Sequence, residues 1–79
     1  MIDVIFSKIE NGSAIRTEEV IGQCNNYPII GEPFDMIAPP LTNGFAYRCI
    51  QTSDVRQIIE ESNNVKIIHT RNSIYKLQF

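Results

Sequence analysis

The sequence is poor in the residues that favour helices. It holds two Leu and three Ala, against fourteen Ile, four Val and four Thr. β-Branched side chains lose rotamer freedom in a helix and pack well on a pleated sheet, so they favour strands. The composition therefore predicts a β-rich fold.

Cysteine is scarce, and the chain does not start with a basic segment followed by an apolar run. Cys24 and Cys49 could form at most one bridge, and Asp3 interrupts the short apolar stretch at the start. Such a stretch is too short to span a bilayer and does not resemble a secretory signal. We therefore expect two reduced thiols in a cytoplasmic protein.

Residue spacings typical of metal sites are lacking as well. Cys24, Cys49 and His69 lie far apart and fit neither a C-x-x-C nor an H-x-x-x-H pattern. The neighbouring carboxylates of Glu60 and Glu61 would point to opposite faces of a strand, which suits solvation better than a shared ion. We expect no metal and no cofactor.

Positive charge is not in excess. Nine acidic and seven basic residues give a net charge of −2, and no run of Lys or Arg is present. Most nucleic-acid binders carry a basic face, because neutralising phosphates supplies much of their affinity. The charge balance makes nucleic acid a less favoured partner than protein.

Alternating apolar residues and turn-forming pairs indicate short strands along one domain, residues 1–79. Asn11-Gly12 and Asn43-Gly44 suit tight hairpin turns, and residues 22–26 are expected to form a turn or loop. Pro28 places the apolar stretch 27–30 on a sheet edge or at a strand start. Strands are expected at 3–9, 14–21, 34–37, 45–52, 66–70 and 74–79. The prediction is a mainly antiparallel small β-barrel or roll of five to seven short strands.

Residues 53–62 fit two structures. Ser53 could cap a short helix near 53–61, with Val55, Ile58 and Ile59 on one face. The same segment could be a strand over 55–60, turning at 62–64 into the next strand, and we favour this alternative. A faint repeat of 15–30 in 50–68 suggests two similar β-units closing on one core, as in a barrel.

The proline-rich segment 31–41 is the most conspicuous part of the chain. If it loops over the surface, it presents Phe34, Met36 and Leu41 on a stiff backbone, which lowers the ordering cost of binding a partner. Alternatively, it is an irregular strand that covers one end of the barrel. The sequence supports both alternatives equally.

Two further site hypotheses use the basic and aromatic residues. One is a small β-barrel that binds a nucleotide or single-stranded nucleic acid, with charge and stacking supplied by Arg48, Lys66, Arg71, Lys76, Tyr47 and Tyr75. The other is a small ribonuclease in which His69 is the general base and Arg71 and Tyr75 support a phosphate. The acidic balance disfavours both.

The segments Thr52-Ser-Asp-Val55 and Thr70-Arg-Asn-Ser-Ile-Tyr-Lys-Leu77 resemble the C-terminal hairpin of small uncharacterised β-domains of phages and mobile elements. The resemblance covers about a third of the chain, and these proteins carry no assigned activity to transfer. It implies a phage or prophage protein, a class in which short acidic proteins often inhibit host machinery.

Together these features favour a non-enzymatic protein-binding module. Its expected partner is a host or phage protein, and its expected role is that of a regulator or inhibitor. A homodimer is a further expectation, because a chain this short can complete its core across a two-fold axis.

Overall fold

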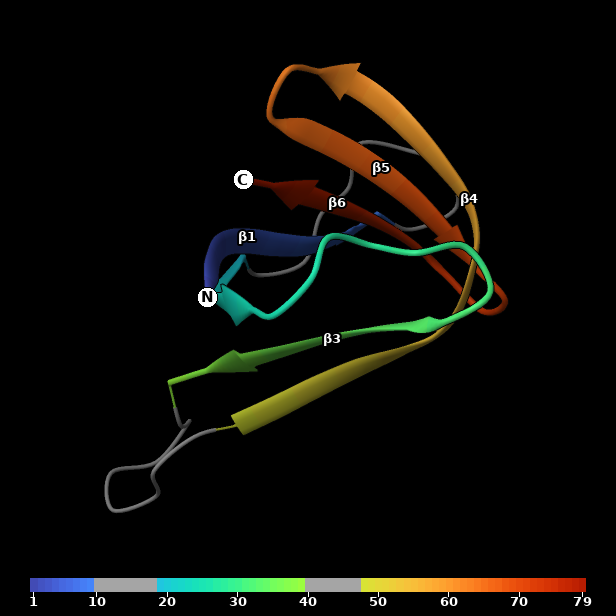
Figure 1. Cartoon of the computed structure of the whole chain (residues 1–79). Coiled ribbons are helices and arrows are strands. Elements are labelled where there is room, and N and C mark those ends of the chain that lie inside the picture. The colour runs from blue at the N-terminus through green and yellow to red at the C-terminus, as the bar shows by residue number, and fades with distance from the viewer. Residues whose placement is uncertain (10–18, 40–47) are drawn as a thin grey trace.

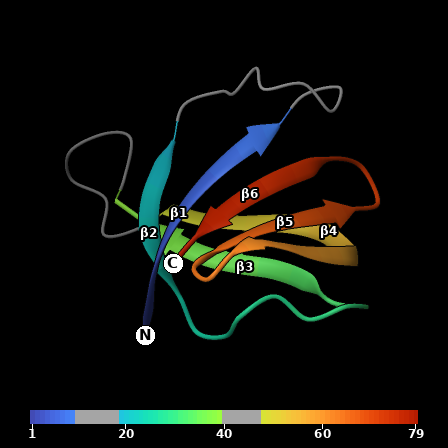
Figure 2. The ribbon, with the colours of Figure 1, turned by 90° about the horizontal axis from the view of Figure 1, so that it is seen from above.

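The computed structural model describes residues 1–9, 19–39 and 48–79. These residues form a closed antiparallel barrel in which each strand pairs with the next along the chain and the first pairs with the last (Figure 1). The strands are β1 (Ile2–Ile9), β2 (Val20–Cys24), β3 (Pro33–Ala38), β4 (Arg48–Ser62), β5 (Val65–Thr70) and β6 (Ile74–Gln78). Figures 1 and 2 both show β6 between β1 and β5. The predicted small β-barrel is confirmed.

The core follows from alternation along these strands. Every second residue points inward, because successive side chains of a strand lie on opposite faces. The buried apolar side chains come from all six strands: Val4, Phe6, Cys24, Phe34, Met36, Ala38, Val55, Ile68 and Leu77. Phe6 stacks on Tyr75, with ring centroids 4.8 Å apart, and lies parallel to Phe34 at 6.4 Å. This aromatic stack links β1, β3 and β6 across the interior.

The long strand β4 is shared by both halves of the barrel. Its first half pairs with β3 and its second half with β5, and the register shifts in each pairing. Such bulges bend a strand and increase its twist, which lets one strand turn the corner of a small barrel. Residues 53–62 are therefore extended, and the strand alternative is confirmed.

The β2–β3 pairing is the shortest contact in the barrel. It has one registered pair, Gln23 with Ile37. Gly22 lies in β2, so the expectation of a turn or loop at 22–26 is wrong for its first three residues. A Cβ at Gly22 would overlap the carbonyl oxygen of Ile37, so only glycine permits this approach of the two backbones.

The loop between β2 and β3 crosses the side of the barrel that faces the viewer in Figure 1. The Glu32 N–H donates to the Ile29 carbonyl (3.2 Å), and Gly31 has a φ of 92°, as in a type II turn. Two further bonds join the turn to β4: the Gly31 N–H donates to the Val55 carbonyl (2.8 Å), and the Val55 N–H donates to the Glu32 carbonyl (2.9 Å). The stretch 27–30 is thus part of an anchored loop and not of a strand.

Several sequence-based expectations concern residues outside the described part of the chain. The two Asn-Gly turns, Leu41 and Tyr47 are among them. The two Ile-Ile pairs of the suggested repeat have different structures, since Ile29-Ile30 lies in the loop and Ile67-Ile68 in β5.

Candidate functional site

The anchored loop exposes a run of large apolar side chains. Tyr27 is 54%, Ile29 47% and Ile30 61% exposed. Together with Pro28, these residues form what we call the ridge (27–30). Contiguous exposed apolar side chains are unusual on a small protein and often mark a contact surface.

One side of the ridge borders a hollow of about 360 Å³, which we call the hairpin hollow because it lies against the β4–β5 hairpin. The Tyr27 ring meets the Phe79 ring edge to face, with centroids 4.9 Å apart. The Phe79 N–H donates to the Asn64 carbonyl (2.7 Å), which holds the end of the chain against the hairpin turn. The hollow is lined by Tyr27, Pro28, Ile58, Asn63, Asn64, Lys66 and Phe79.

The cation of the hairpin hollow already has a partner. Lys66 Nζ donates to Glu60 Oε1 across the β4–β5 pair. This hydrogen bond, together with the positive charge of Lys66, lowers the pKa of the Glu60 carboxyl from its ordinary value. The remaining walls of the hollow are aromatic, aliphatic or amide groups, which suit an apolar guest with a polar edge.

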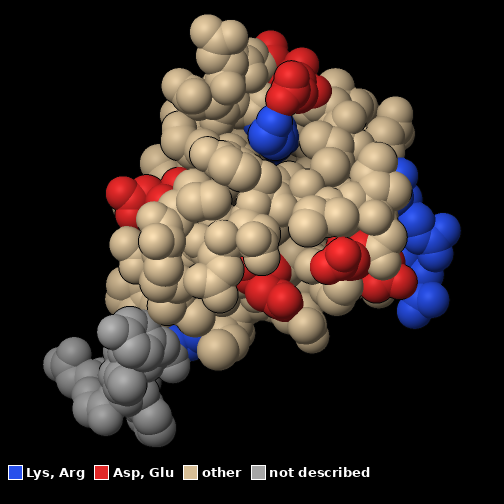
Figure 3. All heavy atoms as spheres, viewed as in Figure 1, with Lys and Arg blue, Asp and Glu red and all other residues tan. Residues whose placement is uncertain are grey.

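A smaller hollow of about 110 Å³, the loop hollow, also borders the ridge. Tyr27 and Pro28 line both hollows, so the two hollows adjoin at the ridge. Glu32 and Asp35 line the loop hollow, and both are exposed. Figure 3 shows both acidic and basic groups around a wide uncharged area of the face seen in Figure 1. The two carboxylates of the loop hollow place negative charge next to the ridge.

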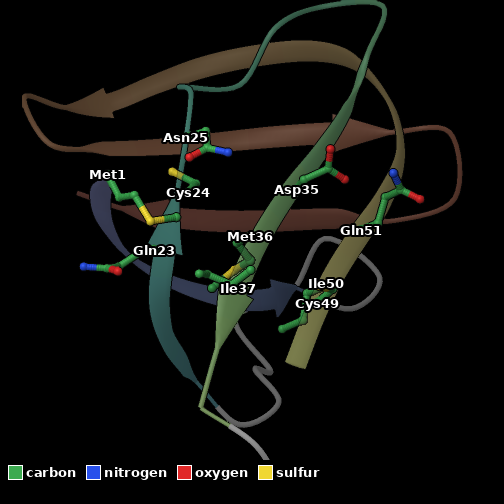
Figure 4. Close-up of a pocket in the computed structure, with 10 residues that line it drawn as sticks. All are labelled: Met1, Gln23, Cys24, Asn25, Asp35, Met36, Ile37, Cys49, Ile50 and Gln51. Carbon is green, nitrogen blue, oxygen red and sulfur yellow. The ribbon is translucent and has the colours of Figure 1, made fainter. Parts of the chain in front are cut away.

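A third hollow, of about 300 Å³, lies at the β2–β3 seam (Figure 4). Asn25 and Asp35 line both this seam hollow and the loop hollow. Cys24 and Cys49 line it as well; both thiols are free, Cys24 buried and Cys49 exposed. Burial raises the pKa of the Cys24 thiol, which makes it a poor nucleophile near neutral pH.

In the described part of the segment 31–41, Phe34 and Met36 are not presented to solvent, and Leu41 lies outside the described residues. Phe34 and Met36 point into the barrel from β3 and are each 3% exposed. Of the two alternatives for this segment, the structure shows the strand for residues 33–38. Phe34 and Met36 are therefore not available to a partner while the barrel is folded.

The residues of the nucleic-acid hypothesis do not share one face. Tyr75 is stacked on Phe6 inside the barrel, whereas Lys76 lies on the outer face, where it pairs in register with Ser7. Lys66 stands near the start of β5, and Arg71 follows the end of that strand. Arg48 is half-buried at the start of β4.

The ribonuclease hypothesis needs His69 close to Tyr75, and the register separates them. His69 pairs with Ile74 across the β5–β6 ladder, so the next residue, Tyr75, points to the opposite face. His69 is half-buried on the outer face, and Arg71 is exposed in the turn that follows.

Within residues 1–9, 19–39 and 48–79, no three His, Cys, Asp or Glu residues are grouped so that they could hold a metal ion. The same part of the chain contains no helix that is long and apolar enough to cross a membrane.

Sequence analysis did not single out Ile29, Ile30 or Phe79. One signal for the first two was present, since Gly31 follows an apolar pair and supplies the positive φ that a type II turn needs. No local signal pointed to Phe79, because its role depends on Tyr27, far away in the sequence. Comparison with protein-family models, with curated proteins and with solved structures gives no match to this chain, so the geometry of the ridge carries the functional argument.

Proposed function

We propose that the chain is a non-enzymatic protein-binding module whose contact surface is the ridge and the adjoining hairpin hollow. The observation that carries this proposal is the exposure of Tyr27, Ile29 and Ile30 on a loop that is tied to the barrel. The turn at 29–32 makes one internal hydrogen bond and two to β4, and the Tyr27 ring packs on Phe79.

Anchoring of the loop matters because association is opposed by the cost of ordering loops and side chains. A turn that is already anchored in the free protein avoids much of that cost. Aromatic residues beside a pocket are also the kind of residue that carries most of the energy at protein interfaces. Tyr27 and Phe79 supply such a pair.

In its finer form, the proposal is that the module regulates or inhibits a host or phage protein. This finer form rests on the resemblance of the C-terminal segments to phage and mobile-element domains.

The test is a low-salt purification of the tagged protein from its natural host background, followed by mass spectrometry of what it retains. The ridge variant Ile29→Ser/Ile30→Ser is compared with Ile21→Ser/Ile59→Ser, which removes two exposed isoleucines from β2 and β4. We expect one stoichiometric protein with the wild type and the β2/β4 variant, and its loss with the ridge variant.

Equal retention by both variants would show that the partner binds elsewhere and would refute the ridge as the contact surface. Retention of nucleotides or nucleic acid in place of a protein would refute the proposal in favour of the nucleic-acid alternative. Circular dichroism of each variant checks that the barrel persists.

A further inference from the structure

We infer that the partner segment bound at the ridge is basic: an apolar anchor residue flanked by Lys or Arg. This inference rests on the proposed function and adds the chemistry of the partner. It follows from the distribution of charge in the two hollows that adjoin the ridge.

The loop hollow holds two carboxylates without a cation. Glu32 and Asp35 line it together, and neither forms an ion pair with another described residue. Of the residues in 1–9, 19–39 and 48–79, no Lys or Arg lines that hollow. A cation placed there by a partner would meet two carboxylates that no described Lys or Arg pairs with.

The hairpin hollow suits the anchor and not a further charge. Lys66, the one cation among the described residues that line it, is paired with Glu60. Tyr27, Phe79 and Ile58 offer apolar walls, while the Asn63-Asn64 turn offers amide groups at the edge. An aromatic or large aliphatic side chain fits this chemistry best.

Because Tyr27 and Pro28 line both hollows, a short segment laid across the ridge can reach both at once. Its anchor would enter the hairpin hollow and its basic flank the loop hollow. The net charge of −2 for the whole chain favours approach of the same kind of partner and opposes that of a polyanion.

The test uses the full chain, labelled with ¹⁵N, and three synthetic peptides with a central phenylalanine flanked by lysine, serine or glutamate. A fourth peptide has a central alanine flanked by lysine. Amide shifts are followed at low and at high salt. We expect the lysine–phenylalanine peptide to bind best, to shift amides of residues 27–32 and of Phe79, and to weaken as salt rises.

Two charge-matched variants refine the test. Glu32→Gln/Asp35→Asn removes the carboxylates of the loop hollow, and Asp3→Asn/Glu61→Gln removes two exposed carboxylates that do not line it. For the lysine–phenylalanine peptide, we expect the first variant to bind on the order of threefold to tenfold more weakly. The second should change the affinity by less than about twofold, because a salt-screened distant charge contributes little.

The outcomes separate the inference from the proposed function. If the serine-flanked peptide binds the ridge as well as the lysine-flanked one, and the first variant binds normally, the basic partner is refuted while the ridge remains a binding surface. Best binding by the glutamate-flanked peptide, or equal binding by the alanine peptide, also refutes the inference. If no peptide shifts the ridge, or if a single-stranded oligothymidine shifts it instead, both the inference and the proposed function fail.

Discussion

Two glycines of the barrel are required by the backbone for different reasons. At Gly22 the obstacle is steric, because the backbone of Ile37 occupies the space of a Cβ, and Met36 Cε would lie 2.8 Å away. At Gly31 nothing lies within 4 Å of a Cβ, and the obstacle is the positive φ. A side chain at Gly22 would therefore cost packing energy, whereas a side chain at Gly31 would cost backbone conformational energy.

We expect Gly22→Ala to lower the free energy of unfolding by about 3 kcal/mol, the upper end for overpacking, because the obstacle is backbone and cannot rotate away. Gly31→Ala should cost about 1–2 kcal/mol, the usual penalty for a left-handed conformation. Urea denaturation of both variants measures the difference. Wild-type stability for Gly22→Ala would contradict the close approach of β2 and β3.

The Glu60–Lys66 pair gives stability a definite dependence on pH. The folded-state pKa of Glu60 lies below its ordinary value, so the unfolded chain binds the proton more readily. The contribution of the pair is therefore present above the ordinary carboxyl pKa of about 4.3 and is lost as pH falls through the lower, folded value.

Lys66→Met removes the cause of that shift. We expect the wild type to be more stable than Lys66→Met at neutral pH and the difference to shrink below about pH 4. Urea unfolding at neutral and at acidic pH measures it, with Glu60→Gln as the control that removes the titrating group itself. If the stability difference between the wild type and Lys66→Met stays constant down to acidic pH, the ion pair does not cause the pH dependence.

At this scale the sequence could predict alternation but not which face of 31–41 is buried. Phe34, Met36 and Ala38 alternate with Pro33, Asp35 and Ile37, a pattern that fits an inward-facing strand as well as a stiff surface loop. The choice was decided by β4, to which β3 is paired, and by Thr52, whose hydroxyl accepts the Phe34 N–H (3.0 Å). Neither partner is adjacent to the segment in the sequence.

Among the elements, the same dipeptide has two different structures. Ile67-Ile68 lies in β5, with Ile68 fully buried, whereas Ile29-Ile30 is exposed in the ridge. Pro28 and Pro33 cannot donate to a sheet ladder, and Gly31 favours a turn, so the first pair is surrounded by residues that interrupt a strand. The same signals are compatible with a sheet edge or a strand start, which is the prediction made for 27–30, and the structure has a turn there instead.

Ile30 occupies the second position of the type II turn, where proline is favoured. We expect Ile30→Pro to keep the fold and to raise the free energy of unfolding by about 0.4–1 kcal/mol, because proline restricts the unfolded chain. Thermal and urea unfolding measure the change, and Ile29→Pro, at the first turn position, is the control that should not stabilise. Destabilisation by Ile30→Pro would contradict the turn type.

The whole molecule is a ring that closes where β1 meets β6. Composition and alternation predicted a barrel. They could not predict the β1–β6 pairing that closes it, because the two strands are far apart in the sequence and no local pattern records their contact. Closure also removes the exposed sheet edges that favour aggregation. A substitution that shortens a buried side chain in one strand should therefore destabilise all six strands together.

A thiol reagent can test whether the barrel opens cooperatively. In a Cys49→Ser background, Cys24 in β2 is the only thiol that the reagent can label. Leu77→Ala in β6 should cost about 2–5 kcal/mol, because Leu77 is fully buried. If the ring opens as a unit, Cys24 should react at least about 30-fold faster in that variant. An unchanged rate would show instead that β2 opens locally, independently of β6.

The pairing of β1 with β6 also has a consequence for biosynthesis. While the ribosome makes the chain, β2 to β5 can pair with their neighbours as they emerge, but one edge of β1 stays open until β6 follows. Contacts between distant segments form slowly, because the entropy of a long loop must be lost before they are made. We therefore expect the nascent chain to carry an unpaired β-edge until β6 is available, and the barrel to close only then.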